Sequence, residues 1–544
     1  MKKKLLFIAV VFISNLNAQT WQQLEKIVAS DRKSNQQFGN AVDIDGPYAI
    51  VGTWLEDRDG NGQNTMQMAG AAYIFEGDGK TGYTQKVKIL PNDRDTVAEF
   101  GYDVAISGNY AIVGCPANDF DANGSNYVDW AGAAYIFEKQ SSGSWIQVQK
   151  LVASDRLAGS TNGGSFGFSV DIDSNVAVIG TYNQDVIVGS THHVAAGEVY
   201  VFERNSSGVW NETQKLIASD FNATDYFGTS VAIHKNRIIV GSHQNYTNAT
   251  GGNFSFFTGA AYIFEKQTSG TWTEMQKIVA NDRRSMAYFG WSVGICNDFA
   301  IIGAYGDSAD ASGLNNIHNA GSAYIFEYNT SNTWVQTQKI VSSYRDNDGR
   351  FGWAVDVSDS TAIIGAFQEG DTSSINQLTQ AGSTHIYKRN SSGNWNLLNK
   401  ALSSDLASGD YYGYDVAIKN DRAIIGAVYE DENVLGTGSL FNSGSAYIFR
   451  ATSGSSSLSV SEKNKNTFAL YPNPTADFVT IVLENNLEKV QLEIVDATGK
   501  LLFENSFDNS APKTLNLSNL TNGLYLVRVK TSIGVSTERI VINR

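Results

Sequence analysis

Two acidic loops carry the residue types and spacing that can bind a hard cation. Each contains the pattern Asp-x-Asp-x-Asn-Gly, in which oxygen-bearing side chains alternate before a turn glycine. Ca²⁺ prefers such oxygen ligands, so one hypothesis is a calcium site in each loop. Neither loop has a glutamate at its twelfth position, which excludes an EF-hand, and a pair of solvated Asx-turns is the alternative. The candidate ligands are Asp57, Asp59 and Asn61 in the first loop and Asp119, Asp121 and Asn123 in the second.

Aromatic residues form a second set of candidates. A Trp or Tyr stands five residues before a lysine at seven places, beginning with Trp21 and Lys26. Such regular spacing favours packing between structural units over a ladder of sugar-binding platforms. Four tryptophans depart from this spacing, and two of them, Trp54 and Trp130, lie in or near variable loops. We interpret Trp54 and Trp130 as candidate ligand-binding residues, since tryptophan often dominates recognition.

The sequence shows no set of residues with the spacing of a catalytic site. The stretch 163–167 fits Gly-x-Ser-x-Gly, but a nucleophile elbow leads into a helix, whereas a strand is expected here. An aspartate recurs once in most units, from Asp31 to Asp405, and we expect it to accept backbone N–H bonds at a chain turn. A ring of cation ligands is the alternative. We therefore predict that the chain is not an enzyme, although a repeat protein can assemble a site from several of its units.

These candidates are distributed over seven copies of one unit. A Phe-Gly or Tyr-Gly pair recurs at intervals of 61 to 66 residues, and each copy continues with a short alternating stretch, a polar turn and a run such as AIVG. A long variable loop, a run such as AAYIFE and a last alternating stretch complete the unit. Period-two alternation with β-branched and aromatic residues predicts four short strands per unit, which is typical of propeller blades. The pairs begin at Phe38, Phe100, Phe166, Phe227, Phe289, Phe351 and Tyr412.

The two ends of the repeat region complement each other. The last unit lacks its fourth strand, whereas residues 20–32 match a fourth strand and precede the first Phe-Gly pair. The predicted fold is therefore all-β, a seven-bladed β-propeller in which the N-terminal strand closes the last blade and removes an exposed sheet edge. Strand order places the long loops, and the segments that enter each Phe-Gly pair, on one rim. Loops on a rigid scaffold usually carry recognition, so we expect the functional site there.

Composition and charge limit the possible partners. The 544 residues carry a formal net charge of −15, which argues against a nucleic-acid partner because phosphate is repelled. Residues 1–18 combine three lysines with an apolar run and end on a small residue, as expected of a secretory signal peptide. No later stretch predicts a transmembrane segment. Cys115 and Cys296 occupy different repeat positions, which favours buried free thiols over a disulfide.

The repeat region, residues 19–450, resembles the FG-GAP repeat family, which is related to the propeller of integrin α-subunits. The matching residues are the Phe-Gly pairs, the Val-Gly that ends the second strand and the AYIF-type run in the third. The resemblance implies a propeller. Many members of the family carry a calcium-binding hairpin between the first two strands, but the corresponding turns here are short, so that site is not implied.

The tail has a different character. Residues 451–466 are serine-rich and polar and predict a linker. Residues 467–544 contain six short alternating stretches, which predict a small β-sandwich. This segment resembles the type A C-terminal sorting domain of the type IX secretion system of Bacteroidetes, which implies export across the outer membrane by that machinery. The matching motif residues are Tyr471, Pro472, Asn473, Pro474, Gly523, Tyr525 and Arg528.

Taken together, the sequence predicts a secreted or cell-surface binding or adhesion protein. Its ligand would be a glycan or a protein surface, recognised by the rim loops, and its one cofactor would be Ca²⁺ if the acidic loops bind a cation. A hydrolase or lyase that acts on extracellular polysaccharide from the same rim is one alternative. A surface spacer without a specific ligand is another.

Overall fold

The computed structural model describes residues 20–77, 82–156, 163–370, 378–436, 438–452, 468–471, 475–483, 490–496, 500–507, 513–531 and 534–544. The predicted signal peptide and nearly all of the predicted linker lie outside this part of the chain. The chain divides into two compact units, residues 1–454 and 455–544, and each is described by itself. Within the described residues all regular structure is β-strand.

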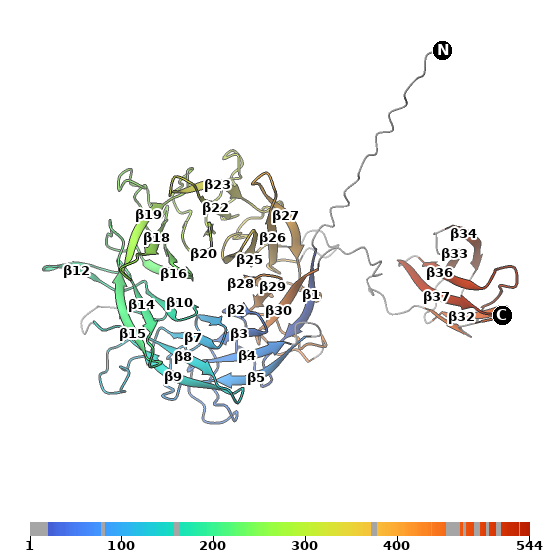
Figure 1. The fold of residues 1–544 in the computed structure, drawn as a ribbon, viewed down its shortest axis with the longest axis horizontal. Helices are drawn as coiled ribbons and strands as arrows, with labels where there is room; N and C mark the ends of the chain where they lie inside the picture. The colour runs from blue at the N-terminus through green and yellow to red at the C-terminus, as the bar shows by residue number, and fades with distance from the viewer. Residues whose placement is uncertain are drawn as a thin grey trace, which may run out of the picture. The chain divides into compact units, whose positions relative to one another are not determined.

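The first unit contains seven antiparallel sheets of four strands each. Figure 1 shows them arranged in a ring, with the first strand of each sheet near the centre and the fourth strand outside. The sheets are numbered in the order of the ring. Sheet 1 is β2 (Val42–Asp45), β3 (Tyr48–Thr53), β4 (Ala71–Gly77) and β5 (Tyr83–Ile89), and sheet 2 is β6 (Val104–Ser107), β7 (Tyr110–Cys115), β8 (Ala133–Lys139) and β9 (Trp145–Leu151). Sheet 3 is β10 (Ser169–Asp173), β11 (Val176–Thr181), β14 (Glu198–Arg204) and β15 (Trp210–Leu216). A small hairpin, β12 (Val186–Val188) and β13 (Thr191–His193), extends the long loop of sheet 3.

The remaining four sheets follow the same plan. Sheet 4 is β16 (Phe227–His234), β17 (Arg237–Ser242), β18 (Ala260–Lys266) and β19 (Trp272–Ile278); sheet 5 is β20 (Val293–Cys296), β21 (Phe299–Ala304), β22 (Ser322–Tyr328) and β23 (Trp334–Ile340). Sheet 6 is β24 (Val355–Ser358), β25 (Thr361–Ala366), β26 (Ser383–Arg389) and β27 (Trp395–Ala401); sheet 7 is β28 (Tyr412–Lys419), β29 (Arg422–Ala427), β30 (Ser445–Thr452) and β1 (Thr20–Ile27). The prediction of four strands per unit is confirmed.

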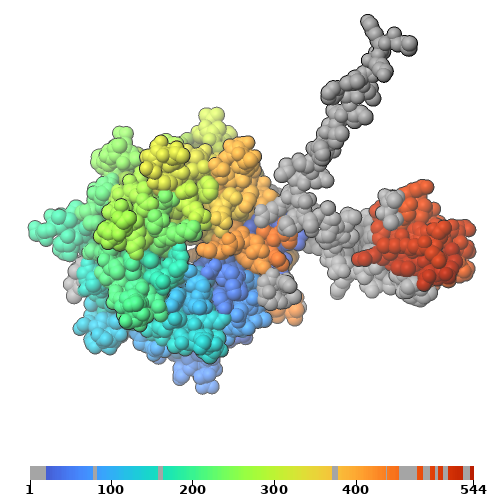
Figure 2. Space-filling model, in the orientation of Figure 1, coloured from blue at the N-terminus to red at the C-terminus, as the bar shows by residue number. Residues whose placement is uncertain are grey.

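Strand β1 completes sheet 7, as the sequence predicts. It pairs antiparallel with β30, with Trp21 opposite Ala451 and Ile27 opposite Ala446. In Figure 2 the blue of the first residues and the orange of the last repeat accordingly meet in the ring. Strand β30 runs to Thr452, two residues past the predicted end of the repeat region. The first and last segments of the repeat region therefore share one sheet.

The apolar core lies between neighbouring sheets. In sheet 1, Ile50 packs toward sheet 2, whereas its neighbours Ala49 and Val51 pack toward sheet 7. Both faces of the second and third strands are thus covered, which explains why runs such as AIVG are continuously apolar. Seven such clusters occur, and the one between sheets 7 and 1 has the same make-up as the others.

Two glycines per repeat form one of the close contacts between sheets. A Cβ atom on Gly303, at the end of the second strand of sheet 5, would lie 2.0 Å from the carbonyl oxygen of Gly352, which belongs to the next Phe-Gly pair. Only glycine allows this approach. The same contact joins Gly52 to Gly101, Gly114 to Gly167, Gly180 to Gly228, Gly241 to Gly290, Gly365 to Gly413 and, between the last and first repeats, Gly426 to Gly39.

Backbone bridges link the same neighbours. Gly70, just before the third strand of sheet 1, forms a parallel bridge with Phe100, and Gly444 forms the equivalent bridge with Phe38. The last and first repeats are therefore joined by the bonds that join other neighbouring repeats. Cys115 and Cys296 are buried and free, which confirms the prediction of free thiols.

The second unit contains two sheets. Strands β31 (Phe468–Tyr471), β32 (Phe478–Leu483) and β35 (Lys513–Asn516) form one; β33 (Val490–Asp496), β34 (Leu501–Phe507), β36 (Gly523–Thr531) and β37 (Gly534–Ile542) form the other. The six predicted strands are present, and β31 is an additional one. Val479 of the first sheet and Leu492 and Val527 of the second share one apolar core. This common core is what the predicted β-sandwich requires.

Candidate ligand-binding site

A cavity of about 430 Å³ opens where the first strands begin. We call it the rim cavity. Two positions of every repeat line it, the second and the third residue after the Phe or Tyr of the Phe/Tyr-Gly pair. The residues at the second position are Asn40, Tyr102, Phe168, Thr229, Trp291, Trp353 and Tyr414; those at the third are Ala41, Asp103, Ser169, Ser230, Ser292, Ala354 and Asp415.

The long loops also reach this cavity. Trp54, Pro116 and Tyr182 line it from the start of the loops after the second strands, and Trp130 does so from the far end of one such loop. Glu99 and Ser165 line it from the segments that enter the Phe-Gly pairs. The expectation that both kinds of segment open on one rim therefore agrees with the residues that line the cavity.

Eight of the residues that line the cavity are aromatic. The rings of Trp291 and Trp353 lie 4.7 Å apart between centroids, and Trp353 lies 5.9 Å from Tyr414. On another part of the wall the Tyr102 and Phe168 rings lie 4.9 Å apart. These separations lie in the range in which aromatic pairs stabilise each other, so the rings hold one another in place. The wall is a preformed apolar surface of the kind that small-molecule sites use.

Both aromatic residues singled out from the sequence lie at this cavity. The Trp54 indole Nε1 donates to Gln37 Oε1 at 3.1 Å, and the Trp54 ring contacts Tyr102. Trp130 is 44% exposed, and its backbone N–H donates to Asp119. Sequence reasoning missed Trp291 and Trp353, because each stands out in the sequence only as a departure from a regular pattern. The signal that finds them is their identical place, two residues after a repeated phenylalanine.

Three carboxyl groups line the cavity, and they differ in their partners. Asp103 accepts backbone N–H bonds from Val104 at 2.9 Å and from Val170 of the next sheet at 2.7 Å. Asp415 accepts from Val42 of the next sheet at 2.7 Å. Burial raises the pKa of Asp415 to about 7. Both aspartates therefore join neighbouring sheets at the floor of the cavity.

Glu99 is the exception. Its side chain is buried, with the residue 9% exposed, and within the described residues it accepts no hydrogen bond. Burial is the cause that raises the pKa of Glu99 to about 7. Its carboxylate oxygens are not fully buried and remain accessible from the cavity, where a bound molecule can donate to them.

The backbone at Glu99 is also unusual. All seven residues that precede a Phe/Tyr-Gly pair have φ between 54° and 60°, in the left-handed region that non-glycine residues rarely adopt. The Glu99 N–H donates to the carbonyl of Met68 at 3.0 Å, and the Phe100 N–H donates to that of Ala69 at 3.1 Å. These hydrogen bonds to the preceding long loop hold the backbone in this conformation. They thereby fix the direction of the side chain that stands before the Phe-Gly pair. Because all seven repeats share this conformation, it is a property of the repeat rather than of Glu99 alone.

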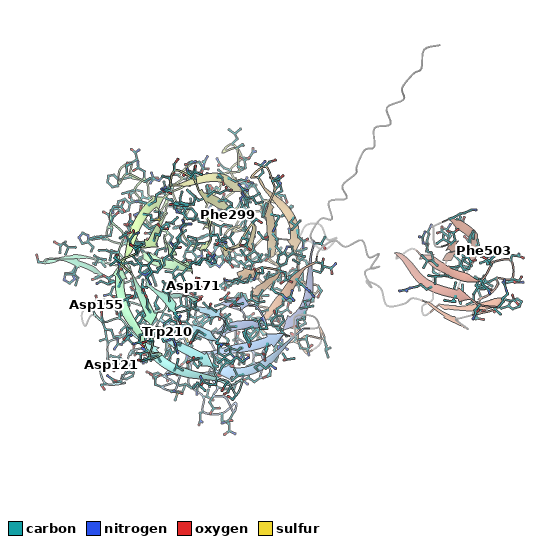
Figure 3. The ribbon with its side chains drawn as sticks, viewed as in Figure 1. Asp121, Asp155, Asp171, Trp210, Phe299 and Phe503 are labelled. Carbon is teal, nitrogen blue, oxygen red and sulfur yellow. The ribbon has the colours of Figure 1, made fainter. Side chains whose placement is uncertain are left out.

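Three further aspartates stand five residues after the Phe of a Phe-Gly pair, two residues beyond the position that Asp103 occupies in its repeat. Asp43, Asp171 and Asp356 line a smaller cavity of about 80 Å³ near the short hairpins, and Asp171 is seen near the centre of the ring in Figure 3. The Asp171 carboxylate accepts from Ile172 in its own strand and from Ile233 in the next sheet, both within 2.7 Å. Burial raises the pKa of Asp171 to about 7. Because their oxygens accept backbone N–H bonds across the sheets, these residues hold sheets together.

The loops proposed to bind calcium have a different local structure. Asp121 Oδ1 accepts N–H bonds from Asn123 at 3.0 Å and from Ser125 at 2.8 Å, and its Oδ2 accepts from the Asn126 amide. Asp59 makes the same set of bonds in the first loop. These are Asx-turns, the alternative considered from the sequence. Figure 3 shows Asp121 at the outer edge of the ring, away from Asp171.

The other proposed ligands have partners within the protein. Lys33 Nζ donates to Asp57 Oδ1 at 2.7 Å, and the Trp130 backbone N–H donates to Asp119 Oδ1 at 2.8 Å. Asn61 and Asn123 contribute backbone N–H groups to the turns. Among the residues that the structure describes, no three His, Cys, Asp or Glu side chains form a group that could hold a metal ion. Calcium binding stays an untested hypothesis, and the hydrogen bonds of the two turns favour the Asx-turn alternative.

Calcium binding can be tested by thermal unfolding. We expect the melting midpoint of the repeat unit to be the same in millimolar calcium as in chelator, because the Asp59 and Asp121 carboxylates already accept three hydrogen bonds each. Differential scanning fluorimetry of the mature chain measures this. A midpoint that rises in calcium for the natural chain, but not for Asp121→Ala, would establish a calcium site instead.

The expectation that the aspartate repeated before the Phe-Gly pairs mainly accepts backbone N–H bonds is wrong. The main donors to this aspartate are side chains of the next sheet, not the backbone N–H groups that the sequence predicts. Asp220 accepts from the Tyr262 hydroxyl at 2.7 Å and from Lys277 Nζ at 2.7 Å. Asp31 is bound in the same way by Tyr73 and Lys88. The tyrosine of the AYIF run and the lysine of the fourth strand thus explain why the aspartate recurs.

The regular aromatic residues pack between sheets, as predicted. Trp145 of sheet 2 contacts Tyr48 of sheet 1 with ring centroids 5.6 Å apart, and Trp395 of sheet 6 contacts Phe299 of sheet 5 at 5.4 Å. These tryptophans are buried, so they do not form a ladder for a ligand.

The proposed sorting residues lie in the second unit. Tyr471 ends β31, whereas Pro472, Asn473 and Pro474 lie outside the described residues. Gly523, Tyr525 and Arg528 are in β36, and the Tyr525 hydroxyl donates to the Thr521 carbonyl at 2.8 Å. The last residue, Arg544, is held by Asp477 at 2.7 Å and by two backbone carbonyls.

Seven four-stranded sheets around a common centre define an all-β repeat protein whose architecture is consistent with a β-propeller. The chain belongs to the FG-GAP repeat family. The family model matches seven segments, residues 21–75, 83–137, 145–202, 210–264, 272–326, 334–387 and 395–449.

A second family model, the secretion system C-terminal sorting domain, matches residues 469–543. This domain indicates export by the type IX secretion system to the cell surface or the extracellular space, and it implies interaction with that machinery. In the part of the chain that the structure describes, no helix is long and apolar enough to cross a bilayer. The comparison with curated proteins found no match.

Proposed function

We propose that the repeat region is a closed seven-bladed β-propeller that binds an extracellular ligand at the rim cavity. The ligand is a glycan or a protein surface, and the chain binds it without catalysing a reaction on it. The observation that carries this proposal is the aromatic wall of the cavity, in which side chains from most of the repeats converge on one space.

The repeat structure supports a division between scaffold and site. Residues that join the sheets, such as Gly303 and Gly352, have the same type in every repeat, because the contact between sheets is the same. The residues at the second position after the Phe or Tyr vary among the repeats, from Asn40 and Thr229 to Phe168 and Trp291. Variable side chains on an invariant frame are the arrangement expected of a recognition surface.

The half-buried Trp291 and Trp353 provide the test. We expect the double variant Trp291→Ala, Trp353→Ala to bind the ligand at least 10-fold more weakly, since aromatic anchors in a pocket often contribute 2 kcal/mol or more, about a 30-fold change in affinity. The measurement is binding of the mature chain to a glycan and surface-protein array, followed by titration calorimetry on the hits. Phe254→Ala is the matched control, because Phe254 is 73% exposed and does not line the cavity.

Two outcomes contradict the proposal. Hits that bind the double variant as well as the natural chain place the site elsewhere. New chain ends in a polysaccharide panel incubated with the natural chain, but not with the double variant, indicate a hydrolase or lyase.

A further inference from the structure

The charge of the rim cavity indicates the kind of ligand it accepts. Its lining includes three carboxyl groups, Glu99, Asp103 and Asp415, and no Lys, Arg or His among the described residues. Aromatic faces attract cations through their quadrupole. The chain shows this within the same aromatic network, where the Arg350 guanidinium lies 5.6 Å from the Trp353 ring centroid. A bound cation would favour the ionised form of these carboxyl groups, whereas an anion would be repelled by it, so the cavity favours a cationic ligand over an anionic one.

Glu99 locates the charged group within the cavity. Asp103 and Asp415 already accept backbone N–H bonds, whereas Glu99 accepts none from the described residues and faces the cavity. A ligand ammonium group would provide both hydrogen-bond donors and a positive charge. It would thereby satisfy the one carboxylate of the cavity that the protein leaves without a partner among the described residues.

Hydroxyl groups around the floor favour a sugar as the carrier of that ammonium group. Ser230 Oγ accepts the Val293 N–H at 3.1 Å, and Ser292 Oγ accepts the Val355 N–H at 3.0 Å. Within the described residues each hydroxyl proton is left to donate into the cavity. A sugar ring presents a face to an aromatic ring and hydroxyls to such donors, whereas the alkyl chain of a lysine presents no hydroxyls.

We propose that the rim cavity binds an amino-substituted glycan, with a sugar ammonium group paired to Glu99 and sugar faces against Trp291 and Trp353. This inference rests on the proposed binding role of the rim cavity and specifies the class of ligand.

The test uses two oligosaccharides of the same backbone, β-1,4-linked glucosamine and its fully N-acetylated counterpart. Titration calorimetry with the mature full-length chain at pH 7 should show at least 10-fold tighter binding of the glucosamine oligomer. Glu99→Gln should remove that preference by weakening only the glucosamine complex. Glutamine fits this backbone, because Gln37 occupies the equivalent position of the first repeat with φ 55°. Glu212→Gln, on the outer strand β15, is the matched control for loss of one negative charge.

The pH dependence gives a second readout. The titratable groups near enough to respond to the charge of Glu99 are Tyr102, Tyr182 and Cys115, and burial raises the pKa of all three, so they stay neutral at pH 7. The pKa of about 7 for Glu99 means that its carboxylate gains a proton as the pH falls below 7. Affinity for the glucosamine oligomer should therefore fall below pH 7, and fall again at high pH as the sugar amine loses its proton. Glu99→Gln should abolish the decrease on the acid side.

The outcomes separate this inference from the proposed function. Equal binding of both oligosaccharides, or binding of an oligolysine peptide in their place, overturns the amino-sugar assignment. The rim cavity remains a binding site in those cases if Trp291→Ala, Trp353→Ala abolishes the binding. Absence of binding to the oligosaccharides together with an array without hits overturns both proposals.

Discussion

A chain that lacks residues 20–32 should lose the cooperative unfolding transition of its repeat unit. Removal of β1 exposes the edge of β30 along its whole length, and an unpaired edge is prone to aggregation. It also removes the buried side chains of Trp21 and Ile27. Each large apolar side chain lost from a core costs about 2–5 kcal/mol.

The same deletion breaks a buried ion pair and a link to the next sheet. Lys26 Nζ lies 3.2 Å from the fully buried carboxylate of Glu430, which would lose this cation. Asp31, which binds Tyr73 and Lys88 of sheet 1, would be lost as well. Loss of one partner of a buried pair costs about 3–5 kcal/mol. The sum is on the order of 10 kcal/mol, comparable to the whole stability of a typical domain.

Calorimetry and denaturant unfolding of the two chains measure this effect. A synthetic peptide of residues 20–32 added to the truncated chain should restore a transition, and a scrambled peptide of the same composition should not. A truncated chain that melts at the temperature of the natural one would mean that β1 adds nothing to sheet 7.

A single methyl group added between two sheets should also lower the stability of the repeat unit strongly. Gly303→Ala should destabilise the repeat unit by at least about 3 kcal/mol, the upper end of the cost of overpacking a core. The added Cβ atom would lie 2.0 Å from the Gly352 carbonyl oxygen, and that atom belongs to backbone, which cannot rotate aside. The neighbouring sheets must therefore separate at this contact.

Gly60→Ala is the matched control for this substitution. Gly60 lies in a long loop, where a methyl group added to it would meet no atom within 4 Å, and it does not require a positive φ. Its replacement should change the unfolding free energy by no more than about 0.5 kcal/mol. Equal denaturation midpoints for the two variants would show that the contact between Gly303 and Gly352 is not tight.

Most of the fold could be predicted from the sequence, because it rests on local patterns that recur. Period-two alternation indicated the strands, and the match between residues 20–32 and the other fourth strands placed β1 beside β30. The predicted packing role of residues such as Trp145 is confirmed by its contact with Tyr48 of the neighbouring sheet.

The candidate site could be predicted only in part, since it is made of contacts between repeats. Trp291 and Trp353 are 62 positions apart in the sequence, and only the ring places their side chains together. Asp171 carries no local signal of its role, because the N–H it accepts across the sheets belongs to Ile233, which no local pattern connects to it. The Asp-x-Asp-x-Asn-Gly loops show the converse limit, because the same oxygen atoms that suggest a cation can bond to the backbone of their own turn.

The glycine contacts between sheets also bear on how such a protein can change. Their geometry tolerates no side chain, but it does not depend on which residue stands two positions after the phenylalanine. A tryptophan in one repeat and a threonine in another therefore occupy equivalent positions on the same backbone frame. Exchanging the residues at these positions between repeats should change which ligand is bound while the backbone frame stays the same. The chain is therefore a suitable starting point for engineered receptors.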